Sequence, residues 1–275
     1  MTAAGIAKTP RLILPVSNRT RSVRAFFAIL RRDVAVTLKE FPLFLAQVLL
    51  QPLFFLLIFA KILTGLGYTS PNYQAVLFPG LVALATTITG IQSTAMALVS
   101  EFSWSKEIED RLLAPLPTFG VSLEKLAFGA LRSMIASVIM FPIGIIVLGG
   151  VPFHVGTLPL LVGTVIFGSI VGAAIGLTLG TFVPAEKINM MFALVFTPLL
   201  FSGSTQYPWL SLGNIRWFQV LSAMNPITYV SEGMRGALSP DIPHIPGLVD
   251  FAALVALTLL FSAIGMVGFR RRALS

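Results

Sequence analysis

Long apolar runs alternate along the chain with short polar or basic stretches, and this pattern predicts most of the architecture. A helix needs about 20 residues to cross a bilayer core about 30 Å thick, and six runs have about that length. Each run is apolar on nearly every side, as expected for helices that contact lipid or one another. The sequence therefore predicts an all-α integral membrane protein whose six-span domain covers residues 41–272. The expected spans are residues 41–64, 76–100, 126–149, 157–183, 188–204 and 249–269.

Residues 22–40 show a different pattern, because apolar residues recur there at every third or fourth position. These apolar residues form one helical face, made of Val23, Phe27, Leu30, Val34, Leu38 and Phe41. The basic residues of the same helix are Arg24, Arg31, Arg32 and Lys39. The pattern predicts an amphipathic helix that lies in the membrane interface, with a solvated basic arm as the alternative. Residues 1–21 are expected to form a flexible basic N-terminus.

The segment between the second and third runs, residues 101–125, is polar and charged. Ser105 is a residue type that caps helix starts, acidic residues crowd the next turns, and Pro115 would end the helix. We therefore expect a short charged helix over residues 105–114 that docks on a soluble partner. A connector that lies against the membrane is the alternative. The residues expected to make the docking contact are Glu107, Ile108, Glu109, Arg111, Leu112 and Leu113.

The long segment 205–247, before the last run, is too polar and too rich in proline to span. Its aromatic residues are typical of a membrane interface, and Asn225 followed by Pro226 favours a helix start. Glu232 and Arg235 stand three apart on that helix and can pair, as a structural pair or as part of a gate. Re-entrant helices are therefore expected here. The gate candidates are Asn225, Pro226, Tyr229, Glu232 and Arg235.

The fourth run carries glycines at every fourth position, a spacing that places them along one side of a helix. Such a stripe lets a second helix approach closely. Packing inside the chain is the expected use, and a subunit interface or a sliding surface is the alternative. The stripe consists of Gly168, Gly172, Gly176 and Gly180.

Composition and charge strengthen the membrane prediction. Hydrophobic residues make up 56% of the chain and charged residues 11%, against roughly 25% charged residues in soluble domains. A net charge of +8 would suggest nucleic acid in a soluble protein, but the basic residues stand at the ends of the apolar runs. A membrane surface is the better partner, and no nucleic acid is expected. Of the 19 basic residues, 16 fall on one side of a six-span arrangement, so both termini are expected in the cytoplasm.

The sequence contains no recognisable site for energy coupling or catalysis. The phosphate-binding loop G-x-x-x-x-G-K-[ST] needs a Gly-Lys dipeptide, and the chain has none. No acidic residue falls near the centre of a predicted span, where ion-coupled carriers place ionisable groups. His154 and His244 have no partner at ligand spacing, so no metal site is expected. An ion-coupled carrier or channel, or a membrane scaffold without transport activity, stays open as an alternative.

The layout resembles the ABC type-2 exporter permeases, which move drugs, lipo-oligosaccharides and polysaccharides out of bacteria. The resemblance covers residues 22–272 and begins with the basic amphipathic helix. It continues with LFPGLVALATTITGIQSTAMALVSEF at residues 77–102 and EIEDRLLAPLPTFGVSLEKLAFGALRS at residues 107–133. NPITYVSEGMRGAL at residues 225–238 completes it.

This resemblance implies a permease subunit that is no enzyme by itself and binds no cofactor. Such permeases pair with a second permease subunit, as homo- or heterodimers, and with two copies of a cytoplasmic ATPase that holds ATP and Mg²⁺. The helix over 105–114 would be the coupling helix seated on that ATPase. The amphipathic helix would frame a lateral opening from the inner leaflet, and the far-side helices would help to close the exit. The expected load is amphipathic (drug-like, lipid or lipid-linked glycan), and the expected location is the bacterial inner membrane.

Overall fold

The computed structural model describes residues 18–70, 72–104, 116–151 and 155–273. These residues are helical almost throughout and contain no strand, which confirms the all-α prediction for the described part of the chain. Six helical segments among them are long and apolar enough to cross a membrane. These segments are Phe41–Gly65, Tyr73–Ser103, Thr118–Leu148, Val155–Phe182, Ala185–Ser202 and Gly247–Ala273.

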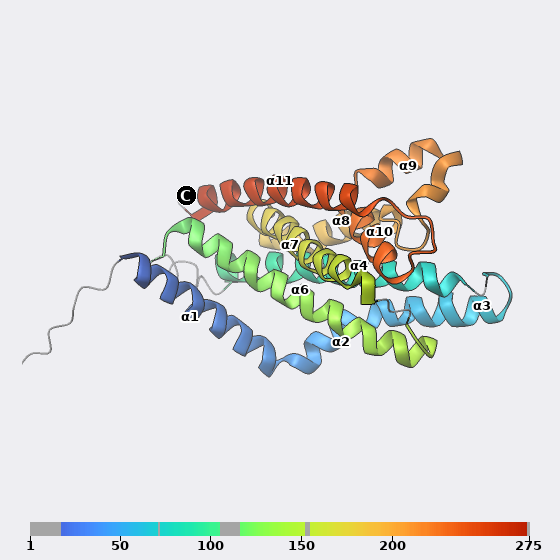
Figure 1. Ribbon diagram of the computed structural model, residues 1–275. Coiled ribbons are helices and arrows are strands. Elements are labelled where there is room, and N and C mark those ends of the chain that lie inside the picture. The colour runs from blue at the N-terminus through green and yellow to red at the C-terminus, as the bar shows by residue number, and fades with distance from the viewer. Residues whose placement is uncertain (1–17, 71, 105–115, 152–154, 274–275) are drawn as a thin grey trace, which may run out of the picture.

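The helices form an elongated bundle with two distinct ends (Figure 1). We call the end with α1 and the last turns of α11 the terminal end, and the opposite end, with α3, α9 and α10, the distal end. The α-helices are α1 (Asn18–Lys39), α2 (Phe41–Phe55), α3 (Leu63–Gly65), α4 (Tyr73–Val99), α6 (Thr118–Leu148), α7 (Leu158–Phe182), α8 (Ile188–Ser202), α9 (Arg216–Ala223), α10 (Pro226–Leu238) and α11 (Gly247–Ala273). The π and 3₁₀ segments are η1 (Leu56–Ile62), η2 (Ser100–Trp104), η3 (Val155–Thr157), η4 (Ala185–Lys187) and η5 (Trp209–Asn214).

Helix α4 forms the centre of the bundle and packs most extensively on α7. A Cβ atom at Gly172 would stand 2.7 Å from the carbonyl oxygen of Thr87, and one at Gly176 would stand 2.4 Å from that of Ile91. Only glycine permits this approach of the two backbones. The first glycine of the stripe meets α10 and the other three meet α4, so all of them pack inside the chain: Gly168, Gly172, Gly176 and Gly180.

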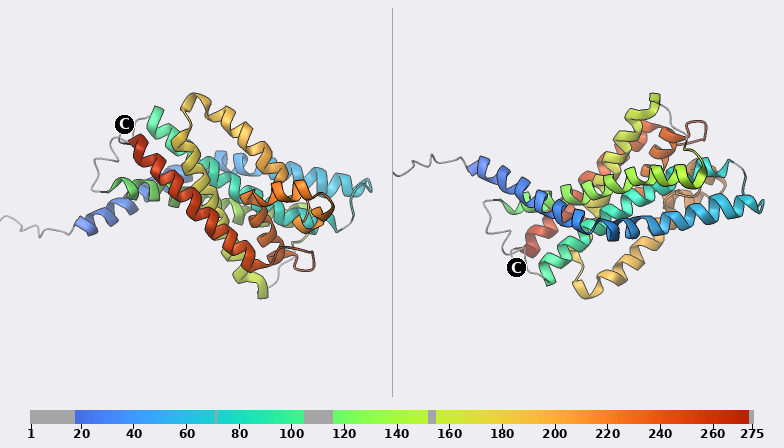
Figure 2. Two further views of the ribbon diagram at one scale, coloured as in Figure 1. Left: turned by 90° about the horizontal axis from the view of Figure 1, so that it is seen from above. Right: turned by 90° about the horizontal axis from the view of Figure 1, so that it is seen from below.

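The other spans surround this central pair and are far less buried. Of the most apolar stretch of the second span 78% is buried, against 11% for the fifth span and 17% for the sixth. Both views in Figure 2 place α8 at the edge of the bundle. Apolar side chains exposed on a span are tolerated because lipid is itself apolar. Helices α4 and α7 therefore form the buried core of the bundle, and the more exposed spans pack around them.

The segment between the second and third spans differs from the predicted loop 101–125. The second span continues through η2, and the third begins at Thr118 rather than near residue 126. Polarity alone placed Lys125 in the loop, but its amino group is 2.6 Å from the Asp33 carboxylate and 2.5 Å from that of Glu101. A charge that is paired in this way can be buried inside a helix. The predicted short helix over 105–114 lies outside the described residues.

Helix α1 packs one side against α6 and leaves another side open. Phe26 and Ile29 lie against a core cluster that includes buried residues of α6 and α7. Phe27 and Leu38, from the predicted apolar face, are each 61% exposed. This exposed apolar side is what a helix in the membrane interface needs, and the interfacial position stays a prediction.

Candidate functional site

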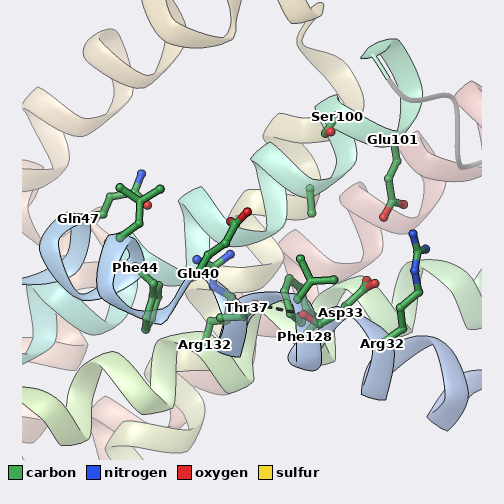
Figure 3. Close-up of a pocket in the computed structure, with 13 residues that line it drawn as sticks. Arg32, Asp33, Thr37, Glu40, Phe44, Gln47, Ser100, Glu101, Phe128 and Arg132 are labelled. Carbon is green, nitrogen blue, oxygen red and sulfur yellow. Dashed lines mark hydrogen bonds between the residues drawn. The ribbon is translucent and has the colours of Figure 1, made fainter.

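A groove runs along α2 and α4 from the terminal end towards the middle of the bundle. It consists of three adjoining hollows of about 280, 360 and 70 Å³. Gln47 of α2 lines all three, so the hollows follow one another along the helix. The first lies among α1, α4 and α6 (Figure 3), and the last ends between Pro52 and Leu84. We call these three hollows together the polar groove.

Uncharged polar side chains line this groove within segments that are otherwise apolar. On each helix they are spaced by three or four positions and therefore share one face. They belong to two helices that cross at the groove, so the two polar faces oppose each other. Within α2 and α4 these side chains are Gln47, Gln51, Thr89, Gln92 and Ser93, and Thr37 and Ser100 also line the groove.

None of these five side chains forms a hydrogen bond with another described residue. Thr89 and Ser93 are nevertheless only 6% exposed each. An amide or hydroxyl without a partner costs about 2–7 kcal/mol on transfer from water to an apolar medium, and lipid tails offer no partner. The groove is therefore suited to hold water or the polar part of a ligand rather than hydrocarbon.

At its terminal end the groove carries an arginine and a glutamate that line both larger hollows. The guanidinium carbon of Arg132 lies 4.6 Å from the ring centroid of Phe44 and 5.7 Å from that of Phe128. Within the described residues, no carboxylate lies within ion-pair distance, 4.0 Å, of this guanidinium. Glu40 is exposed at the junction of α1 and α2, and Figure 3 shows it beside Arg132. Arg132 itself lies inside α6, within the third predicted span.

A buried ionic cluster joins three elements beside the groove. Lys125 of α6 is fully buried and contacts Asp33 of α1 and Glu101 of η2, with Glu124 at 3.4 Å. In the sequence, η2 precedes and α6 follows residues 105–114, the segment predicted to dock on a partner. The cluster therefore links α1 mechanically to the ends of both spans from which that segment departs.

A second Glu–Arg pair lies at the distal end and is fully buried. Glu232 and Arg235 form an ion pair within α10, with no exposed side-chain surface on either residue. The Glu232 carboxylate also accepts the backbone N–H groups of Trp209 (2.8 Å) and Ile245 (3.0 Å), and Arg235 donates to the carbonyl of Ser204 (2.8 Å). Burial lowers the pKa of the Arg235 guanidinium, and the neighbouring Glu232 carboxylate opposes that shift. The pair thus fastens the α8–α9 and α10–α11 connections to α10.

The remaining gate candidates also make fixed contacts at this end. Asn225 caps α10, accepting the N–H of Ile227 at 2.9 Å, and Pro226 follows in the first turn. The side-chain amide nitrogen of Asn225 donates to the carbonyl of Leu199 at 2.8 Å, and this bond connects α10 to α8. The Tyr229 hydroxyl donates to a backbone carbonyl of α9 at 2.7 Å. These contacts are structural, and a gating role stays a prediction.

The predicted site residues are thus distributed over separate places. The gate candidates gather at the distal end, and the predicted interfacial residues are carried by α1: Arg24, Phe27, Arg31 and Arg32. Of these four, only Arg32 lines the polar groove. The predicted coupling residues, from Glu107 to Leu113, lie outside the described residues. Sequence reasoning missed the groove, although lone glutamines inside apolar runs, such as Gln47 and Gln92, were a usable signal.

Comparison with known proteins gives a consistent result. The sequence model of a family described as ABC-2 type transporter matches residues 24–239, from α1 to the end of α10. Over 192 residues the chain is 27% identical to the inner membrane transport permease YadH of Escherichia coli strain K12, covering 69% of this chain and 72% of that protein. Over 247 residues it is 27% identical to ycf38 of Cyanophora paradoxa, which is named as a transport permease, covering 83% and 81%.

Proposed function

The chain belongs to the ABC-2 type transporter family, and on that premise we propose that it is the permease of an ATP-driven exporter with an amphipathic load. In this proposal the polar part of the load moves along the polar groove while its apolar part stays in lipid. The load is of the drug-like, lipid or lipid-linked glycan kind.

The observation that carries this proposal is the unused hydrogen-bonding capacity of the groove. Five of its side chains, Gln47, Gln51, Thr89, Gln92 and Ser93, form no hydrogen bond with a described residue, yet they lie in helices long and apolar enough to span a membrane. Polar groups at such depth generally face a water-filled path or a substrate. A scaffold without transport activity has no use for a polar track of this kind.

Energy would come from outside the chain, because its sequence has no phosphate-binding loop. We assign ATP and Mg²⁺ to a cytoplasmic ATPase, present as two copies on a dimer of permeases. Segment 105–114 would receive the push from that ATPase. The cluster of Lys125 with Asp33 and Glu101 supports this assignment, since it joins α1 to η2 and α6, the elements that precede and follow that segment in the sequence. The terminal end of the bundle would then face the cytoplasm.

The proposal is tested with the permease and its ATPase in proteoliposomes that contain phosphatidylethanolamine labelled with NBD on one acyl chain, which leaves the headgroup zwitterionic. With ATP and Mg²⁺ and no ion gradient, we expect the label to move to one leaflet. Glu107→Ala and Arg111→Ala are expected to slow this movement while membrane insertion stays normal. The ATPase is expected to bind less well to both variants, because the substitutions alter its docking surface.

Two results would count against the proposal. One is unchanged ATPase binding and transport in both variants, which would remove segment 105–114 from coupling. The other is movement driven by a proton or sodium gradient without ATP, which would instead favour an ion-coupled carrier. Permease reconstituted without ATPase is the control and is expected to be inactive.

A further inference from the structure

The mouth of the polar groove presents two opposite charges, which attract each other but form no ion pair within 4.0 Å. Glu40 and Arg132 line both larger hollows. Neither is within 4.0 Å of an opposite charge among the described residues. Each charge therefore has room for a partner from outside the chain.

Two aromatic rings hold the arginine in place while leaving its donors free. Arg132 stacks over Phe44 from α2 and approaches Phe128 on its own helix. Cation–π contacts of this kind fix the plane of a guanidinium without using its N–H groups. Its buried Nε has no hydrogen-bond partner in the described structure. A guanidinium presented in this way matches a phosphate or carboxylate, which it binds with two parallel hydrogen bonds.

The other charges of the first hollow are engaged or lie farther out. Asp33 and Glu101 both contact Lys125 at 2.6 Å or less. Arg32 is exposed and lines only the first hollow. Glu40 and Arg132 are thus the two charges available at the entrance to the second hollow, and their sum is zero.

We propose that this mouth binds the zwitterionic headgroup of a phospholipid, with the phosphate on Arg132 and the ammonium on Glu40. A ligand with one charge would pair with one of the two residues. It would then stand beside the other residue, whose charge has the same sign as the ligand's. An anion alone would meet Glu40, and a cation alone would meet Arg132. Like charges brought together are a recognised means of rejecting wrong ligands.

The surroundings of the mouth fit a lipid better than a free solute. Leu43 of α2 lines the first hollow and is 68% exposed, and Leu50, two turns along the same helix, is 61% exposed. Acyl chains would lie along these side chains while the headgroup enters the groove. This inference rests on the proposed function, because it takes the groove to be the path of the load.

Native mass spectrometry of the purified full chain in detergent tests the inference, with three eight-carbon probes. These are dioctanoyl phosphatidylethanolamine, dioctanoyl phosphatidylglycerol and octyltrimethylammonium. We expect the zwitterionic probe to bind about tenfold more tightly than the other two, as one additional charge-assisted contact would give. Free phosphoethanolamine at the same concentration is expected to bind at least tenfold more weakly, because it lacks acyl chains.

Variants separate the two contacts. Arg132→Gln should weaken the binding of both phosphate lipids about tenfold or more, and Arg132→Lys should restore only part of it, because an ammonium keeps the charge but not the two parallel hydrogen bonds. Glu40→Gln should abolish the preference for phosphatidylethanolamine over phosphatidylglycerol. Lys39→Gln and Asp241→Asn make the same charge changes at exposed positions outside the groove and should leave binding unchanged.

Equal binding of the two phospholipids by the native chain would overturn the inference, as would native affinity in Arg132→Gln. Free phosphoethanolamine that binds as well as the lipid would overturn the lipid assignment. The binding assay needs neither ATP nor the ATPase. If the native chain transports with ATP but shows no preference for phosphatidylethanolamine, the headgroup inference alone is refuted. If it binds phosphatidylethanolamine selectively but does not transport with ATP, the exporter proposal alone is refuted.

Discussion

Two glutamate–arginine couples occupy opposite ends of this bundle and differ in almost every physical respect. At the distal end, Glu232 and Arg235 are fully buried, paired with each other and bonded to backbone groups of two connecting segments. At the terminal end, Glu40 and Arg132 lie beside each other in an open groove without an ion pair to any described residue. The same two residue types therefore serve two different purposes.

The difference lies in whether the hydrogen-bonding capacity of each couple is used inside the chain. A buried charge whose bonds are all made by the protein holds segments together and is costly to break. A charge that keeps its donors or acceptors free is poised to bind something else. Burial alone does not identify a binding group, whereas unused hydrogen-bonding capacity distinguishes the polar groove from the buried couple.

The largest effect is expected from Arg235→Met, because this change leaves the Glu232 carboxylate buried without its cation. Removing one partner of a buried pair costs about 3–5 kcal/mol, which is a large part of the stability of most proteins. We expect loss of monodisperse protein in fluorescence-detected size-exclusion chromatography. The double variant Glu232→Leu, Arg235→Met should recover part of the yield, because neither charge is then stranded. A single variant as stable as the native chain would contradict the structural reading of this couple.

The next largest effect is expected from Gly176→Ala, which tests the packing of α7 against α4. The new Cβ would stand 2.4 Å from the carbonyl oxygen of Ile91, so α7 has to move away from α4. Overpacking of this kind costs about 1–3 kcal/mol. We expect a lower midpoint of thermal unfolding and weaker transport together. Gly65→Ala is the matched control, because a Cβ at Gly65 meets nothing within 4 Å, and it should leave both unchanged.

The fold was largely predictable, because apolar run length and helical spacing are local properties of the sequence. The six spans, the helix start at Asn225 and the glycine stripe all follow from such patterns. The start of the third span was misplaced because Lys125 counts as polar until its partner Asp33, far away in sequence, is known. Pairing between distant segments is not visible in a hydropathy pattern.

The candidate site was predicted less well, for the same reason. Gln47 and Gln92 are unusual inside apolar runs, but only the crossing of α2 and α4 brings them to one groove. Glu232 and Arg235 were correctly expected to be able to pair, because three positions along a helix suffice. Sequence spacing detects neighbours within a helix, and it does not detect which helices meet.

The third prediction removes the arginine of the Glu40–Arg132 couple, as Arg235→Met removes the arginine of the distal couple. Arg132→Gln should leave the midpoint of thermal unfolding within a few degrees of the native value, because it breaks no ion pair among the described residues. ATP-driven transport of NBD-labelled phosphatidylethanolamine should fall about tenfold or more, as loss of one charge-assisted bond implies. A large loss of stability with unchanged transport per folded molecule would erase the contrast between the two couples.

The smallest effect is expected at Gln92, and it separates used from unused capacity within one helix. Gln92 makes no hydrogen bond to a described residue, whereas Gln74, also on α4, donates to the carbonyl of Ala60 at 3.0 Å. Gln74→Leu should therefore cost about 0.5–1.5 kcal/mol, and Gln92→Leu should cost nothing or stabilise slightly. Transport should respond in the opposite order, with about a two- to tenfold loss for Gln92→Leu if the load bonds to this amide. Equal behaviour of the two variants in both assays would mean that the groove amide is not a contact of the load.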